Sequence, residues 1–166
     1  MELFDRKFKE QKKQFFLQCF LAMVSVLTVL VILEAIASAA IVAALGATAF
    51  IVFAIPKARS SAARVIIGGY VIGTVVGTIW HWPAQLKPSG NPVTDRYLAL
   101  ACGAVAVGLA IFVMAITNHE HPPAVGVALG LAIGEWRYET VVVIMVGVIG
   151  LCVAKWVLRE WLKNLV

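Results

Sequence analysis

The residues with the clearest capacity for chemistry in this chain lie in one stretch, ITNHEHPPAVGVALGLAIG, at positions 116–134. His119 and His121 flank Glu120, and two prolines follow directly. Imidazole nitrogens bind metal ions and exchange protons near neutral pH. A helix that begins at a proline also presents backbone N–H groups and the positive end of its dipole, which favour an anion. The stretch therefore predicts either an anion site at a helix N-terminus or a metal site.

The metal site has less support from the sequence. Two imidazoles at positions i and i+2 are only part of a ligand set, because metal centres in proteins use three or more ligands. The third histidine, His81, does not complete the set, since the expected topology places it at the opposite membrane face. The three cysteines are far apart and lie within apolar segments, where cysteine is normally a small buried residue. We predict no metal site and no cofactor, and keep metal-ion transport through residues 119–121 as an alternative.

The composition places these residues in a membrane protein. Of the 166 residues, 61% are hydrophobic and 14% are charged, against about 45–50% and about 25% in soluble domains. The net charge of +5 comes from basic residues beside apolar segments, which indicates membrane topology and no nucleic-acid partner. No hydrolase, metalloprotease or nucleotide-binding signature occurs in the sequence. We therefore expect an integral membrane protein that is not an enzyme.

Six apolar segments define the expected elements, at residues 15–33, 35–55, 65–80, 97–116, 122–134 and 140–158. A helix needs about 20 residues to cross a bilayer, and the 13 residues of segment 122–134 are too few. We predict an all-α membrane protein with about six membrane segments. Four of them are expected to be full spans, and the other two, 35–55 and 122–134, are expected to be broken or half-helices.

The basic residues predict that the short segment still completes a crossing. With six crossings and the N-terminus inside, eleven of the 14 basic residues lie on the cytoplasmic side. If segment 122–134 entered and returned instead, only nine would do so. Because cytoplasmic loops are enriched in Lys and Arg, we expect six crossings, with both termini in the cytoplasm and the protein in the inner cell membrane.

The order of the segments predicts one transmembrane domain, residues 15–166, preceded by a basic amphipathic segment at residues 1–14. A polar loop at 81–95 divides the domain into halves at about 15–80 and 96–158. Each half has three segments, with the interrupted one in the middle. Three crossings per half would make the halves inverted repeats, a common plan in transporters.

The prolines predict how the short segment is built. Proline is favoured in the first helical turn and pushes the preceding residue towards an extended conformation. A helix should therefore start at Pro122, with His121 at its N-cap. If residues 118–121 are extended they climb about 13 Å from the membrane face, and the helix covers about 20 Å more. These lengths place the corner near the membrane midplane, where non-helical backbone must be buried in protein or line a cavity.

An anion at this corner would be bound by His121 and by the amides that follow the prolines. A second helix start is expected near Gly46 in the first half, with Thr48 as a hydroxyl donor, and Arg64 would attract anions on the cytoplasmic side. The candidate substrate-binding residues are Gly46, Ala47, Thr48, Arg64, Asn118, His119, His121, Pro122, Pro123 and Ala124. The plainer alternative is that residues 119–121 form a cytoplasmic loop and that the prolines only begin a helix.

Small residues on segment 65–80 predict close helix packing. They are Gly68, Gly69, Gly73 and Gly77, which recur every few residues. Patterns of this kind let two membrane helices approach closely, so we interpret them as a packing face and not as substrate contacts.

Three short runs carry the features of a known family. They are HPPA at 121–124, LGATA at 45–49 and RVIIGG at 64–69. They are similar to the HPPA, L-G-A-S-A and R-N-x-I-G-G runs of the HPP family of small integral membrane proteins, and together they cover about residues 15–156. The chain departs from the family pattern at Tyr70, where the family often has histidine. It also departs at Val65, Val125 and Val127, where the family has Asn, a small residue and Thr.

The resemblance implies a compact multi-span transporter. Some family members are associated with nitrite movement, and others are fused to soluble regulatory domains. We therefore expect a transporter or facilitator of a small anion, with nitrite as the leading candidate and the lipid bilayer and a second copy of the chain as its other partners. The alternative of another class is a non-transporting membrane sensor or scaffold module, in which the HPP corner is structural.

Overall fold

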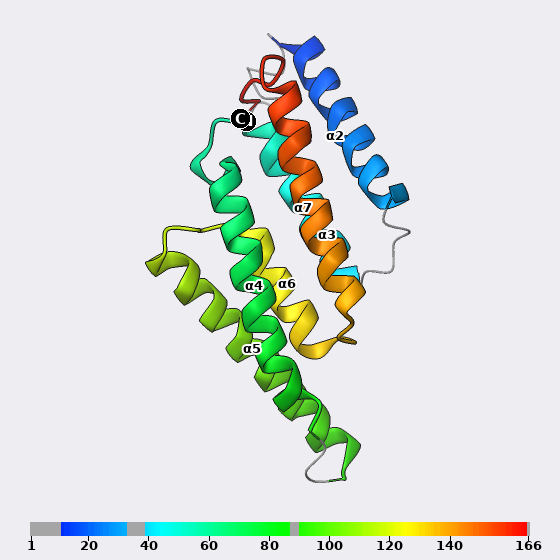
Figure 1. The fold of residues 1–166 in the computed structure, drawn as a ribbon, viewed down its shortest axis with the longest axis vertical. Helices are drawn as coiled ribbons and strands as arrows, with labels where there is room; N and C mark the ends of the chain where they lie inside the picture. The colour runs from blue at the N-terminus through cyan, green and yellow to red at the C-terminus, as the bar shows by residue number, and fades with distance from the viewer. Residues whose placement is uncertain (1–10, 33–38, 87–89, 166) are drawn as a thin grey trace, which may run out of the picture.

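The computed structural model describes residues 11–86 apart from 33–38, and residues 90–165 (Figure 1). The described residues contain helices and no strands, as the sequence predicted, and each of the six apolar segments corresponds to one α-helix. These elements are α2 Lys12–Ile32, α3 Ala39–Ala54, the 3-10 turn η1 Arg59–Ser61, α4 Ala63–Ala84, α5 Pro92–Ile116, α6 Pro122–Ile133 and α7 Tyr138–Leu158. Most of the predicted basic segment 1–14 lies outside the described residues.

The lengths of the helices separate spans from shorter elements. By length and composition, α4, α5 and α7 are able to cross a membrane. In contrast, α3 has 16 residues and α6 has 12, which correspond to about 24 Å and about 18 Å of helix. The two short helices fall in the two segments that the sequence predicted to be interrupted.

Successive helices run in alternating directions (Figure 1). The first turn of α2, the last turns of α3 and α7, and the turn η1 lie together at one end of the molecule, which we call the terminal end. The end of α4 and the start of α5 lie at the opposite end. At the terminal end, hydrogen bonds join the segment after α7 to the end of α3. The Leu165 amide donates to the Ala54 carbonyl at 2.8 Å, and the Lys57 amide donates to Asn164 Oδ1 at 3.0 Å.

A fully buried glutamine reinforces this closure. The Gln18 side chain, on α2, donates to the carbonyls of Phe53 and Lys163 and accepts from the Lys163 amide at 3.0 Å. The Phe53 carbonyl belongs to the last turn of α3, where backbone acceptors have no partner within the helix. One amide side chain therefore connects α2, the end of α3 and the segment that follows α7.

The tightest helix contact is between α4 and α6, which pack together more extensively than any other pair of described elements. A Cβ atom added at Gly73 would lie 2.3 Å from the Ala124 carbonyl oxygen, and one at Gly77 would lie 2.7 Å from the Ala128 carbonyl oxygen. These distances are too short for any larger side chain. The predicted packing face is confirmed, and its partner is the helix that begins at the two prolines.

The connection between the halves is shorter than the predicted loop 81–95. α4 continues through Pro83 to Ala84, and α5 begins at Pro92, so the predicted loop boundaries are wrong. Pro83 lies in the last turn of α4, where it removes only one helical hydrogen bond. The start of α5 is fixed by Asn91, whose side-chain oxygen accepts from the Val93 amide at 2.9 Å.

Candidate functional site

The corner before α6 has the local structure that the prolines predict. His121 is extended, with φ −128° and ψ 92°, and Pro122 and Pro123 occupy the first two helical positions. Neither proline has an N–H group, and the Ala124 amide donates to the His121 carbonyl at 3.0 Å. The first three positions of α6 therefore have no N–H group available for an anion in this conformation.

The chain reaches the corner by a turn, and the predicted extended climb through 118–121 is wrong. Asn118 has a positive φ of 58°. The Asn118 amide donates to the Ala115 carbonyl at 3.3 Å, and the His119 amide donates to the Met114 carbonyl at 2.9 Å. This pair of bonds is the Schellman motif, which ends a helix with glycine or asparagine in the left-handed conformation. Asn118 is therefore the left-handed residue that ends α5, directly after the C-cap Thr117.

The corner lies level with a point between the start of α4 and its middle. A Cβ added at Gly69 would lie 2.8 Å from the His121 Cβ, so His121 is level with Gly69. Gly69 is six residues from the start of α4, or about 9 Å along a helix about 33 Å long. The corner is therefore shallower, relative to α4, than the midplane position predicted from segment lengths.

A buried hydrogen-bond network surrounds the His121 ring. His121 Nε2 lies 2.9 Å from Thr48 Oγ1, which lies 2.8 Å from the Tyr70 hydroxyl, and His121 Nδ1 lies 3.0 Å from the Ser60 carbonyl oxygen. The side chains of Thr48, Tyr70 and His121 have no exposed surface. The network therefore joins α3, η1, α4 and α6 inside the helix bundle.

The Ser60 carbonyl sets the direction of donation in this network. A carbonyl only accepts hydrogen bonds, so His121 Nδ1 carries a proton and donates to it. In a neutral ring Nε2 then accepts from the Thr48 hydroxyl, which in turn accepts from the Tyr70 hydroxyl. A second proton on Nε2 would reverse both of these bonds. The chain is complete in either direction, because hydroxyl groups donate and accept.

The rest of the HEH stretch lies outside this network. Arg59 Nη2 donates to Asn118 Oδ1 at 2.9 Å and lies 3.5 Å from the Glu120 carboxylate. The Arg59 side chain is mostly exposed, and the Glu120 side chain is about half exposed. The His119 ring packs against α4, since a Cβ at Gly68 would lie 2.1 Å from its Cδ2 atom. Among the described residues, no three His, Cys, Asp or Glu side chains are grouped where they could hold a metal ion.

The structure unites only part of the predicted site. Thr48 and His121 are bonded to each other, and Pro123 and Ala124 are buried beside them. Gly46 and Ala47 are exposed on α3, and Arg64 is exposed on α4. The helix start expected near Gly46 is wrong, because α3 continues from Ala39 to Ala54 without interruption. A glycine inside an apolar helix costs only about 1 kcal/mol relative to alanine and does not break the helix.

Sequence reasoning missed Tyr70, Ser61 and Lys155. Tyr70 was noted as a departure from the family pattern, which was the available signal for it. Lys155 was assigned to membrane topology alone, but its Nζ atom lies 2.5 Å from both the carbonyl oxygen and the Oγ atom of the buried Ser61. Ser61 Oγ also donates to the Pro56 carbonyl at 3.0 Å.

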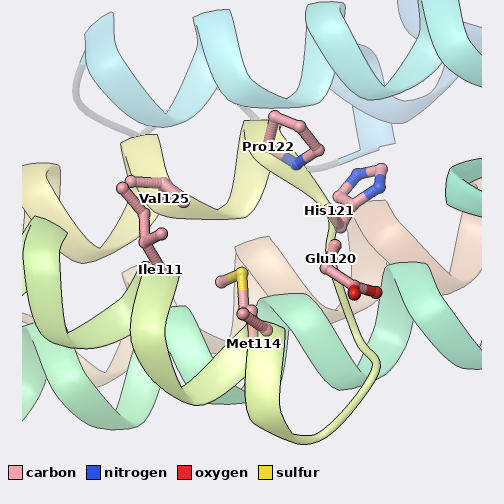
Figure 2. Close-up of a pocket in the computed structure, with 7 residues that line it drawn as sticks. Ile111, Met114, Glu120, His121, Pro122 and Val125 are labelled. Carbon is pink, nitrogen blue, oxygen red and sulfur yellow. The ribbon is translucent and has the colours of Figure 1, made fainter.

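A pocket of about 390 Å³ lies between the end of α5 and the start of α6 (Figure 2). Its lining residues are Ile111, Met114, Ala115, Glu120, His121, Pro122 and Val125. Figure 2 shows the His121 ring turned away from Met114 and Ile111. The pocket is therefore an apolar space beside the buried network, and the imidazole nitrogens do not face it.

Comparisons with known proteins agree with the geometry of a helical membrane protein. A transmembrane protein of Dictyostelium discoideum is 31% identical over 100 residues, which cover 58% of this chain and 32% of that protein. The matched part therefore spans about a third of that relative's length. No solved structure matches the chain. A family model described as "HPP, transmembrane region" matches residues 8–164. Because this match covers nearly the whole chain, the protein belongs to the HPP transmembrane family.

Proposed function

We propose that this protein is a transporter or facilitator of a small anion, with nitrite as the first substrate to test. The observation that carries the proposal is the buried network of Thr48, Tyr70 and His121 within an apolar helix bundle. Polar and ionisable groups inside a membrane protein are costly, and they are usually retained for function. Membership of the HPP family supports a membrane protein of the transport type.

The network supplies the donors that an anion needs once it opens. The hydroxyls of Thr48 and Tyr70 can each turn a proton towards an oxyanion. Protonated His121 would add an N–H donor and a positive charge, so an anion and a proton would bind together. The exposed Arg59 and Arg64 lie at the terminal end near the network and raise the local anion concentration. The amides of α6 are not required in this scheme.

We also propose that α2–α4 and α5–α7 are inverted repeats. Each half has a short helix in the middle, and the two halves run in opposite directions because successive helices alternate. The two short helices supply Thr48 and His121 to the same network. Transporters with inverted repeats place their substrate sites between the repeats in this way. The inner-membrane location, the cytoplasmic termini and self-association belong to the same proposal.

The test is nitrite flux into proteoliposomes that contain the purified full-length protein. We expect flux above that of empty liposomes, and a reduction of about tenfold or more in His121→Ala, the effect of roughly 1.4 kcal/mol. His81→Ala is the matched control, because His81 bonds to the Leu131 carbonyl far from the network. Wild-type protein that moves neither nitrite nor nitrate, formate or chloride would reject the proposal.

The closed state of the network favours a second candidate, a non-transporting membrane sensor or scaffold. Both ring nitrogens of His121 have partners, and the first turn of α6 has no spare donor. In this role His121→Ala would lower stability without changing any flux, and no small anion would raise the melting temperature. Anion binding to the native state would instead stabilise it by about 2.7 kcal/mol at a hundredfold excess over Kd.

A further inference from the structure

Lys155 is a cation that points into the protein from α7. It lies in the last turn of the helix and is only partly exposed. A lysine near the end of a membrane helix normally extends its ammonium group towards water. Here the ammonium group contacts both oxygens of Ser61, a residue with no exposed surface. The direction of the side chain is therefore set by an interior contact.

The positive charge of Lys155 has no carboxylate partner among the described residues. The ion pairs in that part of the chain join Arg59 to Glu120 and Arg137 to Glu139. The Ser61 oxygens are neutral dipoles, and they occupy two of the three donors of the ammonium group. Charges withdrawn from water are normally paired with an opposite charge. An anion is the partner that this arrangement lacks.

Lys155 and His121 approach the same turn of the chain. His121 donates to the carbonyl of Ser60, and Lys155 donates to the carbonyl of Ser61, the next residue. The carbonyl groups that accept from the buried network and from the ammonium group thus belong to adjacent residues of η1. An anion that replaced the Ser61 oxygens at Lys155 would therefore lie next to the turn that holds the His121 ring.

We propose that Lys155 is the residue that binds the anion's charge in the transport site. The proposal rests on the proposed function and names its substrate class, a small monovalent anion such as nitrite, nitrate, formate or chloride. In the empty site Ser61 satisfies the ammonium group. In the occupied site the anion takes the place of the Ser61 oxygens and bridges Lys155 to the donors of the His121 network. Cationic solutes are repelled at this position, and neutral solutes lack the charge attraction that an anion has there.

The test measures nitrite uptake as a function of concentration for Lys155→Gln and Lys155→Arg in proteoliposomes. Lys155→Gln keeps a donor for Ser61 but removes the charge, and we expect its KM to rise about tenfold or more. Lys155→Arg keeps the charge, and we expect most of the wild-type KM to return. Lys163→Gln is the matched control, because Lys163 is exposed at the same end and, within the described part of the chain, bonds through its backbone. A folded Lys155→Gln protein with wild-type KM would overturn the proposal.

A binding measurement separates failure of this inference from failure of the proposed function. Nitrite, formate and chloride are each added to purified wild-type, Lys155→Gln and Lys155→Arg proteins, and the melting temperatures are compared. Stabilisation of the wild-type and Lys155→Arg proteins but not of Lys155→Gln supports the site even if no flux is found. Equal stabilisation of all three proteins, or of none, overturns it. If Lys155→Gln does not fold, the melting temperatures of wild type and Lys155→Arg are compared instead. The proposal is overturned if the anions stabilise neither of these two proteins.

Discussion

At the scale of single residues, Thr48 links the two other members of the buried network. Its hydroxyl lies between His121 Nε2 and the Tyr70 hydroxyl, and all three side chains are withdrawn from solvent. A buried polar atom that loses its partner costs about 1–3 kcal/mol. The stability of the network therefore depends on a hydroxyl group that an isosteric methyl group cannot replace.

We expect Thr48→Val to destabilise the protein by about 2 kcal/mol, because it removes the hydrogen-bond partner that His121 Nε2 and the Tyr70 hydroxyl share. Thr48→Ser retains the hydroxyl and should cost less. The measurement is chemical unfolding of both purified variants in the same detergent. Equal stability of the valine and serine variants would mean that the network contributes nothing to the fold.

Glycine positions provide a second comparison at this scale. A Cβ at Gly73 would lie 2.3 Å from the Ala124 carbonyl oxygen, whereas nothing lies within 4 Å of one at Gly108. We expect Gly73→Ala to force α4 and α6 apart at a cost of about 1–3 kcal/mol. Gly108→Ala should be neutral or stabilising by up to about 1 kcal/mol, since alanine is the better helix former. The measurement is thermal unfolding of the two variants and the wild type. An equal fall in the melting temperatures of both variants would contradict this expectation.

At the scale of elements, the corner between α5 and α6 is built from two caps. Asn118 ends α5 in the left-handed conformation, and α6 begins with Pro122 and Pro123, directly after His121. The Arg59 side chain contacts both Asn118 and Glu120 across this corner. Because the side chains of Arg59 and Glu120 are both substantially exposed, this ion pair should contribute at most about 1 kcal/mol. The caps and the His121 network hold the corner more than the ion pair does.

The cap at Asn118 gives a prediction that separates structure from substrate binding. We expect Asn118→Gly to match wild type in both stability and nitrite flux, because glycine adopts the left-handed conformation without steric cost. Asn118→Ala should lose about 1 kcal/mol of stability. Unfolding and flux assays on the two variants are the measurement. A folded Asn118→Gly protein without flux would show that the Asn118 side chain acts on the substrate, as the sequence first suggested.

The same elements show what could be predicted from the sequence. The helix start at Pro122 was predictable because proline acts on its own backbone and on the residue before it. The helix through Gly46 was mispredicted because a single glycine is a weak signal in an apolar segment. The contacts of Lys155 with Ser61 and of Thr48 with Tyr70 join residues 94 and 22 positions apart. Contacts of that kind depend on how the helices pack, which no local pattern specifies.

At the scale of the whole molecule, the helices set the number of membrane crossings. α6 is about 18 Å long, which is too short to cross about 30 Å of hydrocarbon by itself. It nevertheless begins beside the end of α5, and α7 returns from its far end to the terminal end (Figure 1). This path is compatible with the six-crossing topology that we propose, in which α6 completes a crossing inside the protein and the neighbouring helices cover its ends.

This path predicts which residues are reached from each side of the membrane. Lys57 and Lys163 are exposed at the terminal end, and Gln85 is exposed at the end of α4 on the opposite side. Each is replaced by cysteine in a protein whose three native cysteines have been changed to alanine. A membrane-impermeant maleimide should label Lys57→Cys and Lys163→Cys from one side of sealed proteoliposomes, and Gln85→Cys from the other.

The labelling of Lys163→Cys distinguishes the two topologies that were compared by their basic residues: α6 either crosses the membrane or enters and returns. If α6 entered the membrane and returned to the face it came from, α7 would end on the opposite face, and Lys163→Cys would label together with Gln85→Cys. If α6 completes a crossing, Lys163→Cys labels together with Lys57→Cys. The second result is expected, because the Lys57 amide is bonded to Asn164 and the Leu165 amide to the end of α3. Two segments joined by hydrogen bonds in this way cannot lie on opposite sides of a bilayer.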